Sequence, residues 1–267
     1  MEDVLASAAH PSGPPTEDRC TVVIPCYNEV RRLHINAFQH FLEHDPHRNI
    51  HLLFVNDGST DDTLALLRDF CDRFPERTAY LDQQPNRGKA EAVRRGMLHV
   101  IAEDESKYTG FWDADLATPL EQIPDLLSCL TSNARLNMVF GARVKLLGRN
   151  IQRRLARHYL GRCFATTVSL LLRLPIYDTQ CGAKLFRITP QLQHVLAEPF
   201  RSRWIFDVEI LARFLALHRG DRHPLRTEIF EYPLPVWTDV AGSKVGSLDF
   251  LRAFAELAAI YYRHLAH

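Results

Sequence analysis

The sequence predicts an α/β fold in which a mostly parallel sheet is flanked by helices, and three observations support this prediction. Short apolar runs rich in β-branched residues recur along the first 112 residues, and each of them ends in a polar turn. A helical pattern follows each of the first three turns. Strands that alternate with helices in this way form parallel sheets with both faces covered. Finally, 267 residues with 46% hydrophobic content are enough to bury one sizeable core.

The first predicted strand covers residues 21–25, where the apolar run Thr-Val-Val-Ile ends in Pro25. Proline has no N–H to donate to a sheet ladder, so we expect the strand to stop there. Asn28 and Glu29 then begin an amphipathic pattern that continues to Leu42, which predicts a helix over that stretch.

The second predicted strand covers residues 51–55 and leads into a polar turn in which Gly58 suits a tight bend. Three residues of this turn are candidates to cap the following helix, namely Ser59, Thr60 and Asp61. Further on, residues 86–96 form a basic loop that runs into a helix N-terminus. Such a terminus favours phosphate or another anion.

Two aspartates follow the next predicted strand, the apolar stretch 108–112. Asp113 and Asp115 are separated by one residue, so in an extended segment their carboxylates point the same way. Paired carboxylate oxygens suit Mg²⁺ or Mn²⁺ bound through a diphosphate, with substrate oxygens and water completing the shell. In an open α/β sheet, the carboxyl ends of the strands are also where ligands bind.

Residues 1–19 are proline-rich and without periodicity, which predicts a flexible N-terminal tail ahead of a single domain over 20–267. The tail lacks the basic and apolar regions of a secretory signal. The six cysteines have no paired spacing and are expected to be reduced. The apolar stretch 163–172 is well short of the roughly 20 residues that a spanning helix requires. The amphipathic C-terminal stretch 248–262 could lie on a membrane, and packing on the sheet is the expected role.

The net charge of zero hides an asymmetry, because residues 126–177 contain nine basic residues and no Asp or Glu. A basic helical face beside apolar surface suits an anionic membrane surface or a phosphorylated lipid. A solvated basic helix is the plainer alternative. Nucleic acid is not among the expected partners.

Four segments, taken in order, resemble the successive signatures of family 2 glycosyltransferases: Val23–Glu29, Val55–Thr63, Asn86–Ala90 and Asp113–Asp115. Three later segments resemble the dolichyl-phosphate β-glucosyltransferase group: Asp178–Arg187, Arg203–Leu211 and Val236–Lys244. The resemblance runs from about residue 20 to the C-terminus. It implies the GT-A nucleotide-diphospho-sugar transferase fold, with residues 20–120 as the nucleotide-sugar half and 121–267 as the acceptor half. It also implies an enzyme that inverts at the anomeric carbon.

The resemblance implies a divalent metal, Mg²⁺ or Mn²⁺, and UDP-glucose as the donor. Asp115 would be the chief metal ligand, with Asp113 on the metal, the ribose or the sugar. The residues implied in donor binding are Pro25, Tyr27, Glu29, Asp57 at the uracil ring, Arg87, Lys89, Ala114, Gln180 and Gly182. Lys244 would close over the diphosphate. In related phosphomannose synthases a Gln joins the metal shell where this chain has Ala117, which matches the glucosyl group.

The acceptor implied is a polyprenyl phosphate, whose anionic oxygen needs cations rather than a strong base. The candidates are Arg143, Arg149, Arg153, Lys184 and Arg187, with Trp204 and Glu209 placed near the acceptor by motif. A hydroxyl acceptor would instead need a carboxylate as base, for which Asp207 is the first candidate. Helix capping is the structural alternative for Asp207.

Three functions therefore stay open. The first is glucosyl transfer to a polyprenyl phosphate by a cytoplasmic protein bound peripherally at the inner face of a membrane. The second is transfer by the same fold to a soluble or protein-bound hydroxyl. The third is a nucleotidyltransferase or a silent nucleotide-sugar-binding module. A nucleotidyltransferase usually has a glycine-rich first loop, and this chain has the Pro25–Glu29 turn instead.

Overall fold

The computed structural model of the protein describes residues 18–46, 48–152, 155–240 and 247–265. The strands are β1 (Cys20–Cys26), β2 (Ile50–Asp57), β3 (Thr78–Gln83), β4 (Tyr108–Trp112), β5 (Met138–Ala142), β6 (Asn150–Gln152), β7 (Ala183–Arg187), β8 (Ile229–Pro233) and β9 (Val236–Thr238). The helices are α1 (Ile35–His44), α2 (Thr63–Arg73), α3 (Lys89–Glu103), the short 3₁₀ helix η1 (Leu120–Gln122), α4 (Ile123–Ser132), α5 (Leu155–Leu172), α6 (Pro190–Ala197), α7 (Phe206–Leu217), α8 (His223–Glu228) and α9 (Ser247–His264).

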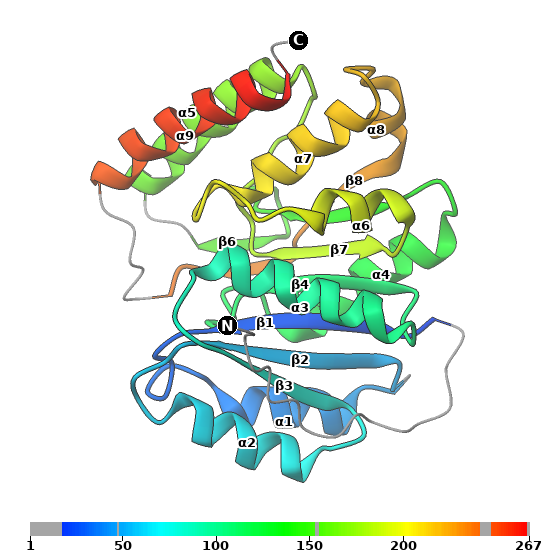
Figure 1. Ribbon diagram of the computed structural model, residues 1–267, viewed down its shortest axis with the longest axis vertical. Coiled ribbons are helices and arrows are strands. Elements are labelled where there is room, and N and C mark those ends of the chain that lie inside the picture. The colour runs from blue at the N-terminus through cyan, green and yellow to red at the C-terminus, as the bar shows by residue number, and fades with distance from the viewer. Residues whose placement is uncertain (1–17, 47, 153–154, 241–246, 266–267) are drawn as a thin grey trace.

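Seven of the strands form one sheet in the order β3-β2-β1-β4-β7-β5-β8 (Figure 1). All neighbouring pairs are parallel except the two that involve β7, which runs antiparallel to β4 and to β5. The reversal matters for function, because it brings the residues just before β7 beside the residues just after β4. The predicted α/β class with a mostly parallel sheet is confirmed.

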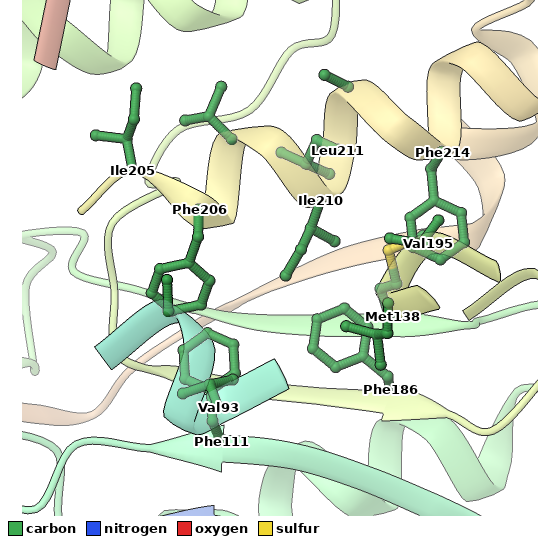
Figure 2. Packing of buried hydrophobic residues seen from close by; sticks show 14 of the residues in the cluster. Val93, Phe111, Met138, Phe186, Val195, Ile205, Phe206, Ile210, Leu211 and Phe214 are labelled. Carbon is green, nitrogen blue, oxygen red and sulfur yellow. The ribbon is translucent and has the colours of Figure 1, made fainter. Parts of the chain in front are cut away.

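The sheet is buried on both faces by two hydrophobic clusters. One contains β-strand side chains together with α1, α2 and α4. The other joins the sheet to α3, α6, α7, α5 and α9. Figure 2 shows Phe206 of α7 lying over Phe111 of β4 in this second cluster, with ring centres 5.3 Å apart. The start of α7 is therefore held against the end of β4, where the paired aspartates follow.

The C-terminal helix α9 packs mainly on α7 and α5, and the expectation that it packs on the sheet was wrong. Figure 1 shows α5 and α9 lying together on the side of α7 away from the sheet. The reason is that α7 already covers the sheet there, so the apolar stripe of α9 meets other helices. No helix in the described part of the chain is both long enough and apolar enough to cross a membrane.

The first helix begins at Ile35, seven residues later than the Asn28 start that the sequence pattern predicts. Asn28 adopts a left-handed conformation with φ of 53°. Its side-chain oxygen accepts a hydrogen bond from the backbone N–H of Thr60 at 2.8 Å. The Glu29 N–H donates to the Thr63 hydroxyl at 2.8 Å. These bonds join the turn after β1 to the turn after β2. The residues before Ile35 therefore form part of the turns at the carboxyl ends of the strands and are not helical.

We expect substitution of Phe54 by alanine to lower the free energy of unfolding by about 3–5 kcal/mol. Phe54 is fully buried in β2, with its ring centre 5.3 Å from that of Phe38 and 5.7 Å from that of Phe70. Chemical denaturation would measure the loss. The half-exposed Phe230 of β8 is the matched control, and its alanine variant should lose less than about 1 kcal/mol. Equal losses at both positions would contradict this account of the core.

Candidate active site

A cavity of about 510 Å³ lies at the edge of the sheet where β1, β2 and β4 end. Its volume is in the range typical of small-molecule sites. Thirteen of the residues proposed from the sequence line it: Pro25, Tyr27, Glu29, Asp57, Lys89, Asp113, Ala114, Asp115, Arg143, Gln180, Gly182, Trp204 and Asp207. Residues from seven separate parts of the chain thus meet at one place.

Asp113 and Asp115 both face this cavity, although not along an extended segment as expected. The chain turns directly after β4, Leu116 takes a positive φ of 52°, and the Asp115 Oδ1 accepts the N–H of Ala117 at 3.1 Å. Burial and the neighbouring Asp113 charge raise the pKa of Asp115. Two partly buried carboxylates that repel each other in this way favour a bound cation.

Lys89 supplies a positive charge at this point. It is the first residue of α3, and its ammonium forms an ion pair with Asp113 Oδ1. The carboxylates of Asp113, Asp207 and Asp115 raise the pKa of Lys89 against the effect of burial. The ammonium is therefore charged and lies at a helix N-terminus, where an anionic ligand is favoured.

Asp57 organises the loop between β3 and α3. Its Oδ1 accepts from Gln83 Nε2 at 2.5 Å and from the Arg87 N–H at 2.8 Å. Its Oδ2 accepts from Asn86 Nδ2 at 2.9 Å and from the Gly88 N–H at 2.8 Å. A carboxylate has about four lone-pair sites, so these four bonds use them all. Burial raises the pKa of Asp57, and the hydrogen bonds act in the opposite direction.

Gly182 lies against the Asp113 carboxylate because β7 is antiparallel to β4. The Asp113 N–H donates to the Gly182 carbonyl at 2.9 Å. A Cβ added at Gly182 would overlap the Asp113 carboxyl group. The absence of a side chain at this position therefore keeps Asp113 in place on the cavity wall.

Arg143 also lines the cavity, together with Asp178. Its guanidinium makes a two-pronged ion pair with the Asp178 carboxylate, at 2.6 and 2.7 Å. It also lies 5.2 Å from the ring centre of Trp237. Glu231 of β8 holds the next turn by accepting the N–H groups of Tyr177 and Asp178 at 2.7 and 2.8 Å. The ion pair thus fixes the position of Arg143, which, unlike Lys184, lines the cavity.

Arg162 of α5 lines the cavity and was not singled out from the sequence. Its guanidinium lies 3.7 Å from the ring centre of Tyr177, and it donates to the Tyr177 carbonyl at 2.9 Å. Arg162 is one of the nine basic residues of the acid-free segment 126–177. The sequence does not show which of them faces the cavity, because that depends on which face of α5 meets it.

Asp207 lines the cavity from the first turn of α7, and it does not cap that helix. Its Oδ1 lies 2.7 Å from Nζ of Lys184, whose side chain is 1% exposed. Lys184 was expected to be a cation for the acceptor, and the structure corrects this expectation. Because its ammonium is enclosed and paired, it is not available to a ligand in the cavity.

Four other proposed residues do not line the cavity. Glu209 is fully buried and pairs with Arg213 at 2.8 Å, so it serves the packing of α7. Arg187 donates to the carbonyls of Leu136 and Leu130 at the other end of β7. The side chains of Arg87 and Arg149 are exposed outside the cavity wall. Arg153 and Lys244, like the tail up to residue 17, lie outside the described residues.

The residues of the site fit a divalent metal bound together with a diphosphate. Asp113 and Asp115 offer carboxylate oxygens, which Mg²⁺ and Mn²⁺ prefer. In the described ranges, no group of three or more His, Cys, Asp or Glu side chains is placed to hold a metal. The protein share of the shell is therefore two carboxylates, which is how Mg²⁺ sites that also use substrate phosphates are built.

Comparison with known proteins agrees with the family resemblance found in the sequence motifs. Residues 21–190 match the family model described as glycosyl transferase family 2. The chain is 32% identical over 263 residues to a dolichyl-phosphate β-glucosyltransferase of Saccharomyces cerevisiae, an alignment that covers 92% of this chain and 75% of the yeast protein. It is 31% identical over 264 residues to the protein of the same name from Dictyostelium discoideum, covering 92% of this chain and 74% of that one.

Among solved structures, glucosyl-3-phosphoglycerate synthase from Mycobacterium tuberculosis with Mn²⁺ and UDP-glucose matches with a TM-score of 0.61 at 19% identity, over 93% of this chain and 79% of that one. A mannosyltransferase from Pyrobaculum calidifontis with GDP-mannose and Mn²⁺ matches with a TM-score of 0.59 at 16% identity, over 97% of this chain and 67% of that one. These likenesses show the GT-A fold.

Proposed function

Because the chain belongs to glycosyl transferase family 2, we propose that it transfers glucose from UDP-glucose to a polyprenyl phosphate of the dolichyl type, with inversion at the anomeric carbon. The main observation in support of a nucleotide-sugar donor is the Asp113–Asp115 pair, which lies with Lys89 in one cavity at the end of β4. The choice of glucose and of a lipid phosphate is supported by relatives that carry that activity in their names.

Asp115 and Asp113 would hold Mg²⁺ or Mn²⁺ together with the diphosphate of the donor. When bound, the metal supplies a positive charge that neutralises the leaving diphosphate. The Lys89 ammonium at the start of α3 would assist as a fixed cation beside the same phosphates. Its ion pair with Asp113 keeps it at this end of the cavity.

The nucleoside end of the donor would lie against the turn that follows β1, where Pro25, Tyr27 and Glu29 line the cavity. Asp57 lies beside this turn, and its oxygens already hold the loop 86–88. We therefore expect Asp57 to support binding of the uracil ring by fixing the conformation of that loop. Gly182, which adjoins Asp113, and Gln180, which also lines the cavity, would lie against the hexose.

The acceptor phosphate would bind near Arg143 and Arg162, the two described arginines of the acid-free segment that line the cavity. A phosphate oxygen is already an anionic nucleophile, so these cations need only position it against the anomeric carbon. Trp204, which is 44% exposed and lines the cavity, offers an apolar surface at the mouth for the first part of the lipid.

A peripheral contact with the inner face of a membrane would bring the cavity to such a lipid. The loop that follows Arg143 presents Leu147 fully to solvent and Leu146 half-exposed, between the exposed Lys145 and Arg149. Apolar tips flanked by cations suit the headgroup region of an anionic bilayer.

The test is a transfer assay with purified protein, UDP-glucose, Mn²⁺ or Mg²⁺ and a short polyprenyl phosphate. We expect release of UDP together with a glucosylated lipid, and we expect chelation of the metal by EDTA to abolish both. The unphosphorylated polyprenol is the control and should give no product. Metal-dependent hydrolysis of UDP-glucose without lipid product would contradict the lipid acceptor and favour a hydroxyl acceptor. If UDP-glucose did not bind at all, the proposal that it is the donor would be wrong.

A further inference from the structure

Lys184 is a charged residue in the middle of the sheet, where an unpaired charge is costly. It lies in β7, and the strand register places it directly opposite Phe111 of β4 and Phe140 of β5. Its ammonium lies 5.4 and 5.2 Å from the centres of these two rings. Burying an unpaired ammonium costs several kcal/mol, so a lysine at this position requires an anionic partner.

That partner is Asp207, whose Oδ1 lies 2.7 Å from the Lys184 nitrogen. Lys184 also donates to the carbonyl of Cys181, the residue before Gly182. One ammonium therefore joins the start of α7 to the turn that leads into β7. Lys184 itself does not line the cavity, so any effect it has on a ligand must pass through Asp207.

Asp207 does line the cavity, as do Lys89 and Asp113, and its charge acts on Lys89. Burial raises the pKa of Asp207, while the charges of Lys184 and Lys89 act in the opposite direction. The Lys184 ammonium, 2.7 Å from the Asp207 Oδ1, favours the ionised carboxylate, which can only accept hydrogen bonds. The ligand group that it holds must therefore donate a hydrogen, as a hydroxyl does and an ionised phosphate does not.

A purely structural role is a poor explanation for this ion pair. Replacing a buried ion pair by apolar residues of similar volume is often neutral or stabilising. The stability of the fold therefore does not by itself require this pair. A buried carboxylate with a specific charged partner in a ligand cavity is, in contrast, typical of functional sites.

We propose that Lys184 is a positioning residue that holds the Asp207 carboxylate toward a hydroxyl of the donor hexose, which makes Asp207 a residue that selects the sugar. This inference rests on the proposed function, because it takes the cavity ligand to be a nucleotide sugar. It assigns Asp207 to the donor sugar rather than to the acceptor phosphate, which its negative charge would repel.

The test compares the affinities of UDP and UDP-glucose, measured by calorimetry with Mn²⁺, for the wild type and two variants. In Lys184→Met and in Asp207→Asn, we expect UDP to bind within about twofold of the wild type and UDP-glucose to bind about tenfold more weakly, as loss of a hydrogen bond to a charged group implies. The double variant should lose no more than either single variant, because both changes break one unit. Lys107→Met, which removes an exposed lysine charge, should leave both affinities unchanged.

Equal weakening of UDP and UDP-glucose in the variants would show that the pair only supports the fold, and would overturn the inference. Unchanged UDP-glucose affinity with lost transfer in Asp207→Asn would make Asp207 a base for the acceptor, and would overturn it too. If Lys184→Met fails to fold, Asp207→Asn carries the comparison by itself. A wild type that binds neither UDP nor UDP-glucose would overturn the proposed donor, whereas the first two outcomes leave that donor standing.

Discussion

Substitution of Asp115 by alanine is expected to lower the rate of sugar transfer about 10³-fold, which corresponds to about 4 kcal/mol of transition-state stabilisation. The reason is that Asp115 and Asp113 are the protein's share of the proposed metal shell, and removing one leaves a single carboxylate beside the diphosphate. Asp115 is partly buried, and among the described residues its Oδ1 accepts a hydrogen bond from the local Ala117 N–H alone. The fold should therefore survive, and the free energy of unfolding should change little.

Two measurements check this expectation. Initial rates of UDP release give the loss of transfer, and titration of Mn²⁺ in the presence of UDP gives the loss of metal affinity. Asp125→Ala is the control, because Asp125 is an exposed acid on α4 whose only described partner is the Tyr232 hydroxyl. If Asp115→Ala kept wild-type rates and Mn²⁺ affinity, the metal assignment would be wrong.

Substitution of Gly182 by alanine is expected to lower transfer about 100-fold, because a displacement of about 1 Å in a reacting group has that effect. The added methyl group would overlap the Asp113 carboxyl, so Asp113 or the turn before β7 must move. Asp113 pairs with Lys89 and would help to hold the metal. Its displacement therefore disturbs two charges of the donor site at once.

Gly220→Ala is the matched control for this variant. Gly220 has a positive φ of 79° with no atom within 4 Å of an added Cβ. Its substitution should cost about 1 kcal/mol of stability and leave transfer unchanged. Steady-state kinetics and thermal unfolding of both variants distinguish a local displacement from a general loss of fold. A Gly182→Ala enzyme with full activity would contradict the tight packing against Asp113.

Most of the donor side was predictable from the sequence because its residues belong to short local motifs. The turn after β1, the loop before α3 and the Asp113–Asp115 pair each follow a strand directly, and strands of a parallel sheet end at one edge. The prediction failed where local pattern competes with long-range bonds. Asn28 resembles a helix start, yet its side chain bonds to Thr60 in the next turn, and the helix begins at Ile35.

The acceptor side was less predictable, because residue type alone does not separate a ligand cation from a structural one. Arg143, Lys184 and Arg187 all come from basic or motif-rich segments. The structure places the first on the cavity wall, the second in a buried ion pair and the third at the far end of β7. Arg162 lines the cavity, although no sequence pattern distinguishes it from the other basic residues of its segment. The face that α5 turns toward the cavity depends on how the helix packs.

The α/β class, the family and the residues that follow β1, β2 and β4 could be predicted from the sequence, since strand pattern and local motifs are encoded within a few adjacent positions. The antiparallel course of β7 between β4 and β5 and the pairing of Lys184 with Asp207 became apparent in the three-dimensional structure. These features depend on contacts between segments more than 20 residues apart in the chain. Strand order and charge pairing across such distances are set by which buried surfaces fit together, and no local pattern carries that information.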